Sequence, residues 1–175
     1  MKRIALRNVV ICDKVTRDDR GFPNAHGIYP GAVELDKKPS LFDASLFAGF
    51  SADIDEDVVV QFSLILPKGR GSGEMSLNKS TDFFDVEVPV LGFASEEGEI
   101  SFRWRVIGGR WSTPIKWKIF FSDDAVELSE DERVAQRALF AAKARVMDLS
   151  EVGKLHEMSG QAAGATTSAR SHSPG

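Results

Sequence analysis

Apolar and polar residues alternate along several short segments within the first 122 residues of the chain. This period of two is typical of β-strands with one buried face, because successive side chains of a strand point to opposite sides. Segment 42–50 shows the pattern clearly, and segment 56–66 repeats it. We expect a buried face on each strand, formed by Phe42, Ala44, Leu46, Ala48 and Phe50 in the first and by Val58, Val60, Phe62, Leu64 and Leu66 in the second.

Further strands are predicted on both sides of these two. Residues 4–12 indicate a largely apolar first strand, and residues 27–35 a short, broken one. Another strand carries four apolar residues on one face, Phe84, Val86, Val88 and Val90. Pro89 within it predicts a sheet edge or a bulge, because proline donates no ladder hydrogen bond. Segment 69–73 (GRGSG) lacks the pattern of a phosphate-binding loop, and we interpret it as a flexible hairpin loop.

A β-hairpin is predicted over 99–118, where two strand-like runs flank Gly108–Gly109. A two-residue Gly-Gly turn sets a register in which apolar residues face one another, with Ile100 opposite Trp117 and Phe102 opposite Ile115. A shift by one residue would mix the two faces. We therefore expect one face in the core and one at the surface: Phe102, Trp104 and Trp117 buried, and Arg103, Arg105 and Lys116 exposed.

The composition changes at residues 129–152, which are rich in Ala, Leu, Glu and Arg. Ser129 and Glu132 form a capping box that predicts a helix start, and Gly153 predicts its end. The stripe expected to pack on the strands consists of Ala135, Ala138, Leu139, Ala142, Val146 and Leu149. Phe140 and Met147 lie on a different side, where they either complete this packing or meet a partner protein.

These elements predict a mainly β protein, an antiparallel sandwich of seven to eight strands with one C-terminal helix. A closed barrel is the alternative architecture. We divide the chain into a sandwich domain over 1–122, a helix packed on it over 123–157 and a disordered tail over 158–175. The tail is predicted because residues 159–175 contain no large apolar side chain.

Composition limits the possible classes of protein. The net charge is −4, and neither residues 1–122 nor residues 123–175 have the basic excess that is typical of non-specific nucleic-acid binding. No apolar run is long enough to span a membrane, and the first residues do not resemble a signal peptide. The single cysteine, Cys12, excludes an internal disulfide and a cysteine-based zinc site. We expect a cytoplasmic protein that does not insert into membranes.

The strongest candidate site is the polar face of the 99–118 hairpin. It carries five cations that can bind a phosphate group, a nucleic-acid backbone or an acidic protein: Arg103, Arg105, Arg110, Lys116 and Lys118. Glu99 is the one acidic residue among them. The alternative interpretation is an ordinary solvated strand face whose charges prevent aggregation.

Other candidate sites are weaker. Asp53, Asp55, Glu56 and Asp57 form one acidic cluster, and Asp13, Asp18 and Asp19 another; each suits either calcium or an ordinary turn. Cys12 with Asp13 and His26 is the remaining candidate for an enzyme site, although the sequence shows no base next to the thiol. No metal site and no cofactor are expected.

Two short motifs resemble a known family. Ile11-Cys12-Asp13 with Gly21 and Gly27-Ile28-Tyr29, together with the W-S-x-P-I-x-W pattern at 111–117, is similar to a family of small uncharacterised bacterial and phage proteins with a β-sandwich fold. The resemblance covers about residues 4–121 and implies the fold. It implies no catalytic or binding residues, because the family has no assigned activity.

Since no catalytic pattern stands out, we expect a non-enzymatic protein-interaction or assembly module from a bacterium or phage. Its partner would be another protein or a second copy of the chain. The alternative is a protein that binds an anionic ligand or nucleic acid through the basic face of the hairpin.

Overall fold

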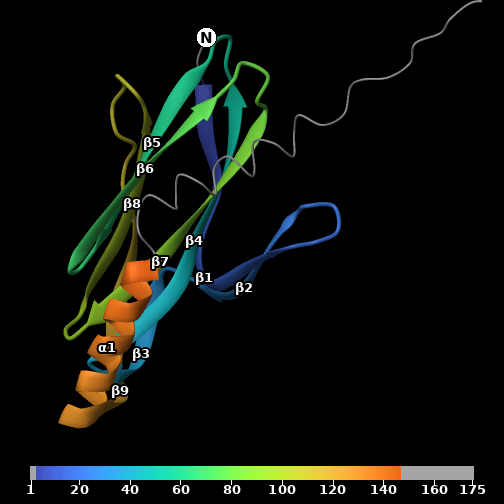
Figure 1. Cartoon of the computed structure of the whole chain (residues 1–175). Coiled ribbons are helices and arrows are strands. Elements are labelled where there is room, and N and C mark those ends of the chain that lie inside the picture. Colours follow the sequence, from blue (N-terminus) through green and yellow to red (C-terminus); the bar gives the residue numbers. More distant parts are fainter. Residues whose placement is uncertain (1–2, 147–175) are drawn as a thin grey trace, which may run out of the picture.

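Two β-sheets pack face to face in a computed structural model, which describes residues 3–146 and the side chains of 3–144 (Figure 1). The four-stranded sheet has the order β2 (Pro23–Tyr29), β1 (Arg3–Arg17), β4 (Ser40–Asp53) and β7 (Phe83–Ala94). The five-stranded sheet has the order β3 (Ala32–Lys38), β9 (Ile115–Glu127), β8 (Gly98–Val106), β5 (Val58–Leu66) and β6 (Gly69–Leu77). The helix α1 (Glu130–Val146) follows β9.

The predicted β-sandwich with a C-terminal helix is confirmed, and the two separate sheets exclude the closed barrel. The described residues form nine strands rather than seven to eight. The additional strand arises because the broken segment 27–35 belongs to two strands, β2 and β3, which lie in different sheets. Gly31 between them has a φ of 83°, a conformation that glycine adopts without strain. The pairing is antiparallel throughout except between β3 and β9, which run parallel.

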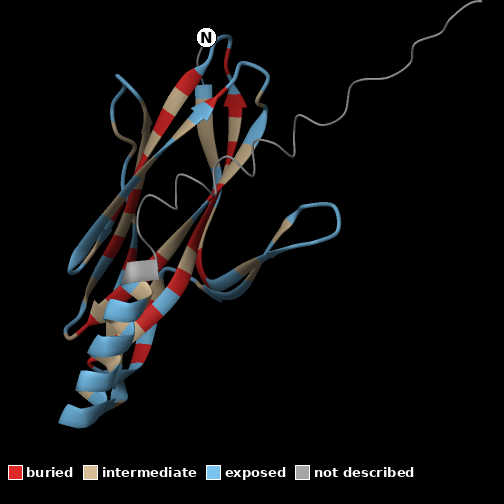
Figure 2. Ribbon diagram, viewed as in Figure 1, coloured by how far each residue is buried: buried red, intermediate tan, exposed pale blue. Residues whose placement is uncertain are grey.

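The core lies between the sheets and uses the predicted alternating faces (Figure 2). All five apolar residues expected on the inner face of β4 are buried, and on β5 only Leu66, at the end of the strand, remains half-buried. Phe50 from β4 stacks on Phe84 from β7 with ring centroids 4.8 Å apart, and Phe62 from β5 stacks on Phe102 from β8 at 6.2 Å. Pro89 lies in β7, which is an edge strand as predicted.

The prediction of a flexible loop at 69–73 is wrong. These residues begin β6, which pairs with β5 from Gly69 opposite Leu66 to Leu77 opposite Val58. Only Pro67 and Lys68 form the turn. Glycine has a low strand propensity, but a neighbouring strand can still pair with its backbone.

The register predicted for the 99–118 hairpin is confirmed where β8 and β9 pair: Ile100 lies opposite Trp117, and Phe102 opposite Ile115. Phe102 and Trp117 are buried as predicted. Trp104 is only half-buried, although its ring packs edge-on against Phe50 with centroids 5.3 Å apart.

The predicted Gly-Gly turn is wrong. The Gly109 amide donates a hydrogen bond of 2.9 Å to the Val106 carbonyl, and Gly108 has a φ of 82°. A positive φ at the third position marks a type II turn, so Ile107 and Gly108 form its central residues. The following segment, residues 110–114, is not part of a strand, although the Ser112 amide still donates a hydrogen bond of 2.8 Å to the Trp104 carbonyl of β8.

The predicted capping box at the start of α1 is confirmed. The Ser129 amide donates to Glu132 Oε2 at 2.9 Å, and the Glu132 amide donates to Ser129 Oγ at 3.4 Å. The hydrogen bonds from Ser129 lower the pKa of the Glu132 carboxyl. The helix therefore begins where the sequence places it.

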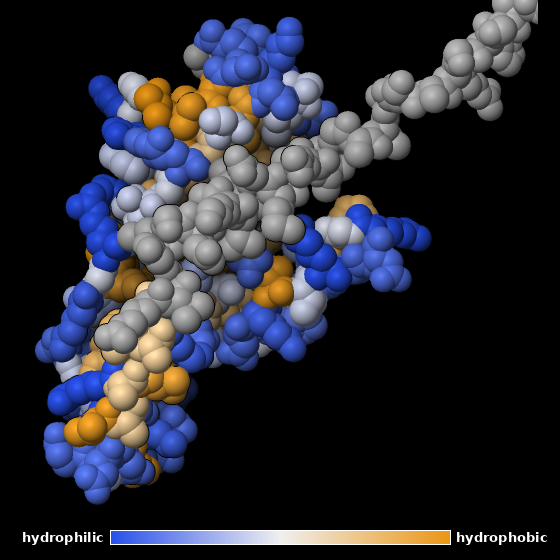
Figure 3. Space-filling model, in the orientation of Figure 1, coloured by the Kyte–Doolittle hydropathy of each residue, from blue (hydrophilic) through white to orange (hydrophobic). Residues whose placement is uncertain are grey.

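The face of α1 that packs on the sandwich differs from the prediction. Phe140 packs against Phe93 of β7 with ring centroids 6.3 Å apart, and Gln136 Oε1 accepts a hydrogen bond of 3.1 Å from the Leu41 amide. The side chains of the expected stripe that the structure describes are exposed, namely Ala135, Ala138, Leu139 and Ala142, and Figure 3 shows apolar surface along α1. Phe140 thus completes the packing of α1 within the chain. Met147, Leu149, Gly153 and the tail predicted at 158–175 lie outside the described residues.

Candidate functional site

The β1–β2 hairpin projects from the sandwich (Figure 1), and its tip is held by backbone and side-chain hydrogen bonds. Asp18 Oδ1 accepts hydrogen bonds from the amides of Arg20 at 2.9 Å and Phe22 at 2.8 Å. Gly21, with a φ of 82°, lets the chain turn between them. Asp18 thus fixes the backbone that carries the Phe22 side chain.

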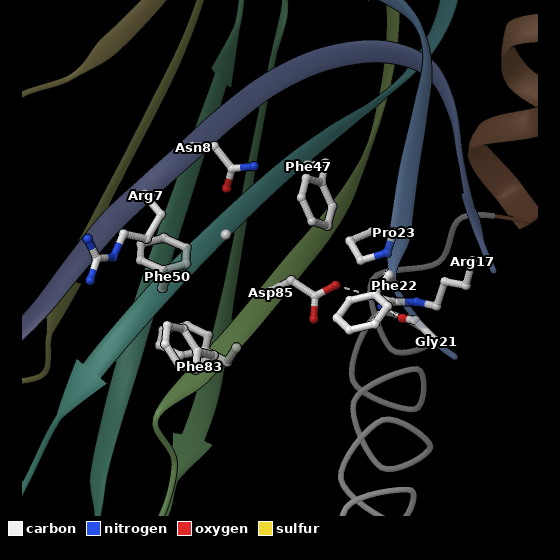
Figure 4. Close-up of a pocket in the computed structure, with 12 residues that line it drawn as sticks. Arg7, Asn8, Arg17, Gly21, Phe22, Pro23, Phe47, Phe50, Phe83 and Asp85 are labelled. Atoms are coloured by element: carbon white, nitrogen blue, oxygen red, sulfur yellow. Dashed lines mark hydrogen bonds and ion pairs between the residues drawn. The ribbon is translucent and has the colours of Figure 1, made fainter. Parts of the chain in front are cut away.

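An ion pair ties this hairpin to the opposite edge of the same sheet. Arg17 near the tip contacts the Asp85 carboxylate of β7, 68 positions away in the sequence. Both side chains keep part of their surface in solvent. The ion pair closes one end of the space between the hairpin and the sheet (Figure 4).

A β-bulge shapes the opposite end of that space. The register of β1 on β4 shifts between Leu6 and Asn8, so that Arg7 is an extra residue opposite Gly49. A Cβ at Gly49 would lie 2.3 Å from Asn8 Oδ1, so the Asn8 side chain keeps this position only next to glycine. Arg7 Nε donates to Ser51 Oγ at 2.9 Å. Bulges re-aim side chains in this way next to many functional sites.

The result is an open pocket of about 360 Å³ between the projecting hairpin and the outer face of the sheet (Figure 4). Phe22 and Phe83 lie on its rim and are 63% and 73% exposed, the two highest values among the large apolar side chains that the structure describes. Phe47 and Pro23 form apolar walls, and Asn8 is one of the polar groups. We call these residues, with Arg7, Arg17 and Asp85, the Phe22–Phe83 pocket.

The sequence patterns did not predict this pocket. One signal was present, because the alternation that places Phe84 inside also places its neighbour Phe83 outside. The approach of Phe22 to Phe83 depends on the fold, and no local pattern predicts it.

The predicted basic face exists, but its residues are not all free. Arg103 and Arg105 are half-buried, which corrects the expectation that they are exposed. Their guanidinium carbons lie 4.6 and 4.5 Å from the ring centroid of Trp111, so both make cation–π contacts. Arg105 Nε also donates to Gln61 Oε1 at 2.7 Å. The segment that follows the turn thus places Trp111 on both arginines.

The other three predicted cations are exposed. Lys116 forms an ion pair with Glu99 at 2.9 Å. Lys118 lies opposite Glu99 in the ladder, and Arg110 follows the turn beside Trp111. The structure therefore gives Arg103, Arg105 and Lys116 partners within the chain, and it leaves Arg110 and Lys118 as the more accessible charges.

Cys12 and His26 do not form a catalytic pair in the structure. The thiol is fully buried and donates to the Ser45 carbonyl at 3.6 Å. Burial raises the pKa of the Cys12 thiol, with smaller contributions from the carboxylates of Glu87 and Asp13, and a raised pKa disfavours the thiolate. His26 Nε2 lies 2.8 Å from Thr16 Oγ1, on the exposed part of the hairpin.

Residues of both acidic clusters make structural contacts. Asp57 Oδ1 accepts a hydrogen bond of 3.0 Å from the Lys79 amide, and Asp18 holds the β1–β2 turn. Within residues 3–146, no three His, Cys, Asp or Glu side chains gather closely enough to hold a metal ion.

Compared with known proteins, the sequence matches no protein-family model and no curated protein. The resemblance of the motifs at 11–29 and 111–117 to a family therefore stays a prediction. In the part of the chain that the structure describes, no helix has the length and apolar character needed to cross a membrane.

Proposed function

We propose that this protein is a non-enzymatic interaction module that binds a protein partner through the Phe22–Phe83 pocket. The observation that carries the proposal is the pair of exposed aromatic side chains on a pocket rim that hydrogen bonds and an ion pair hold in place. Aromatic residues and arginine dominate the energetic centres of protein interfaces, because they combine a large apolar surface with directional contacts.

The chemistry of the pocket suggests its ligand. Phe22, Phe83 and Phe47 offer apolar contacts, and Arg7 adds a cation on the same rim. A partner that presents an apolar or aromatic side chain next to a carboxylate would match both features. Because the hairpin tip is held before binding, association would order few additional groups.

Affinity capture from an extract of the source organism tests the proposal. The full chain is immobilised, captured proteins are identified by mass spectrometry, and co-purified nucleic acid is measured in parallel. We expect a protein that wild type retains and the double variant Phe22→Ala, Phe83→Ala loses. Val126→Ala is the matched control, because Val126 is an exposed apolar residue on β9 that does not line the pocket. Identical capture by wild type and the double variant would refute the proposal.

A second candidate function is binding of an anionic ligand or nucleic acid through the basic face of the 99–118 hairpin. The observation in its favour is the half-buried Trp111 ring, which contacts two guanidinium groups and is followed in the chain by no acidic residue before Lys116, with the exposed Arg110 next to it. Aromatic platforms in a cationic surface are common in proteins that bind single strands. Oligonucleotide binding should then weaken with salt and with Arg110→Glu combined with Lys118→Glu, but not with the control Lys14→Glu on the other sheet. A lack of binding at low ionic strength would exclude it.

We place the protein in the cytoplasm of a bacterium or of a phage-infected cell. The single cysteine is a buried free thiol, which suits a reducing compartment. Localisation of a tagged full-length protein in fractionated cells tests this placement.

A further inference from the structure

The strand β6 forms one edge of the five-stranded sheet and pairs with β5 alone among the described strands. The direction of the backbone groups of β6 follows from the hydrogen bonds that β5 makes on its other side, towards β8. The Ile107 amide donates to the Val59 carbonyl at 2.9 Å, so the odd-numbered residues of β5 direct their backbone groups towards β8. Even-numbered residues of β5 therefore bond to β6, where their partners are Gly69, Gly71, Gly73, Met75 and Leu77. The intervening residues of β6 direct their N–H and C=O groups away from the sheet, namely Arg70, Ser72, Glu74 and Ser76.

This edge lacks the proline that the other edge strands have within the strand or directly after it. Proteins protect exposed edges with proline, because it cannot donate to an added strand. Pro89 lies within β7, Pro23 begins β2, and Pro39 follows β3 directly. All nine residues of β6 are free of proline. An edge strand without proline keeps all of its outward N–H groups available for pairing with another chain.

We propose that β6 pairs antiparallel with β6 of a second copy of this chain, around a two-fold axis that passes through Ser72. Arg70 of each copy then lies directly opposite Glu74 of the other, in pairs where both residues direct their backbone groups outward. The two copies form one continuous sheet. The interface is isologous, as is usual for dimers of identical chains.

The side chains of β6 suit this register on both faces. Arg70, Ser72 and Glu74 are exposed, and Gln61 Nε2 donates to Glu74 Oε1, which keeps that carboxylate on the outer face. On the inner face Gly71 of one copy meets Gly73 of the other, so no side chains collide where the backbones approach most closely. A Cβ at Gly73 would have no atom within 4 Å. Registers shifted by two residues keep the backbone bonds but lose both charge pairs.

Charge reversal with complementation tests the register. In Arg70→Glu both ends of β6 are acidic, and in Glu74→Arg both are basic, so each variant alone repels its own copy. An equimolar mixture of the two variants restores opposite charges at both pairs. Because edge interfaces are small, we expect a wild-type Kd between about 1 μM and about 1 mM by sedimentation velocity on the full chain. We expect each single variant to weaken dimerisation roughly tenfold and the mixture to recover it.

Two substitutions at Ser72 test the backbone contribution. Ser72→Pro removes an outward N–H without removing a bond to β5, and we expect it to abolish the dimer. Ser72→Ala is the control and should dimerise like wild type. Circular dichroism checks that each variant is folded, and the charge-swap mixture tests the proposal even where Ser72→Pro fails to fold. A wild-type chain that stays monomeric up to about 1 mM, or a mixture no stronger than its components, would overturn the proposal. The measurement uses the chain alone, so its outcome is independent of the Phe22–Phe83 pocket.

Discussion

The Tyr29 hydroxyl donates a hydrogen bond of 2.5 Å to Asp13 Oδ1 and joins the two strands of the projecting hairpin. Gly27 lies next to this contact with a φ of 63°, and a Cβ there would come within 1.9 Å of Asp13 Oδ2. The I-C-D and G-I-Y motifs of the sequence therefore meet across one hairpin. Their spacing has a structural reason, because they hold the base of the element that carries Phe22.

The titration of Tyr29 tests this contact directly. The hydrogen bond to Asp13 is the main cause, and burial the second, of the rise in the pKa of Tyr29 to about 12 from its ordinary value of 10.0. Tyr29 is the only tyrosine in the chain, so the ultraviolet absorbance of tyrosinate reports on this residue alone. We expect Asp13→Asn to return the pKa towards 10.0. A wild-type pKa at the ordinary value would contradict the contact.

The same contact predicts how stability depends on pH. The raised pKa means that the folded state favours the protonated phenol more strongly than the unfolded state does. Its contribution is fully present below pH 10.0 and is lost as the pH rises through about 12. In urea unfolding across this range, the free energy of unfolding should fall less steeply in Tyr29→Phe than in wild type. An equal pH dependence in the two proteins would show that the ionisation of Tyr29 is not coupled to folding.

Gly27→Ala should destabilise the protein more than Gly21→Ala. Both glycines have a positive φ, 63° and 82°, so both substitutions carry a backbone strain of about 1–2 kcal/mol. Only at Gly27 does the added methyl group also collide with the Asp13 side chain, whereas no atom lies within 4 Å of it at Gly21. In urea unfolding, we expect Gly27→Ala to lower the free energy of unfolding by about 1–3 kcal/mol more than Gly21→Ala does. Equal losses at the two sites would mean that Asp13 moves aside freely.

The sequence predicts the sandwich well because strand geometry is local. A period of two assigns the faces of 42–50 and 56–66 without knowledge of their partners. The helix face is a different matter, since the alanine-rich stripe and the side with Phe140 are both compatible with a helix. Phe93 and the Leu41 amide, which donates to Gln136, select the second side, and both belong to distant strands.

The candidate sites could be predicted only in part. Alternation places the basic residues of 99–118 on one face, but it does not reveal that the type II turn returns Trp111 onto Arg103 and Arg105. The Phe22–Phe83 pocket depends on a contact between Arg17 and Asp85, which are far apart in the chain. A single sequence contains no record of such a tertiary contact.

Truncation of two phenylalanines should change stability by very different amounts. Phe102 is fully buried and stacks on Phe62, so Phe102→Ala should lower the free energy of unfolding by about 3–5 kcal/mol. Phe83 projects into solvent at the pocket rim, so Phe83→Ala should change it by about 0.5 kcal/mol or less. Urea unfolding monitored by circular dichroism measures both. A large loss at Phe83 would show that this side chain supports the fold instead of being available to a partner.

The basic face should contribute to stability through Trp111. Replacing Arg103 and Arg105 with glutamate removes two cation–π contacts and the hydrogen bond to Gln61, and it places carboxylates against the negative face of the ring. We expect this double variant to lose about 1–3 kcal/mol of stability.

Lys116→Glu is the matched control for that double reversal. Its ion pair with Glu99 is exposed to solvent, and such pairs contribute about 1 kcal/mol or less. Chemical unfolding followed by tryptophan fluorescence compares the two variants under the same conditions. If the double variant is as stable as wild type, the contacts between Trp111 and the two arginines do not contribute to stability. If it is less stable, a loss of binding in that variant cannot be assigned to missing charge alone, and Arg110 and Lys118 become the appropriate positions for testing the face.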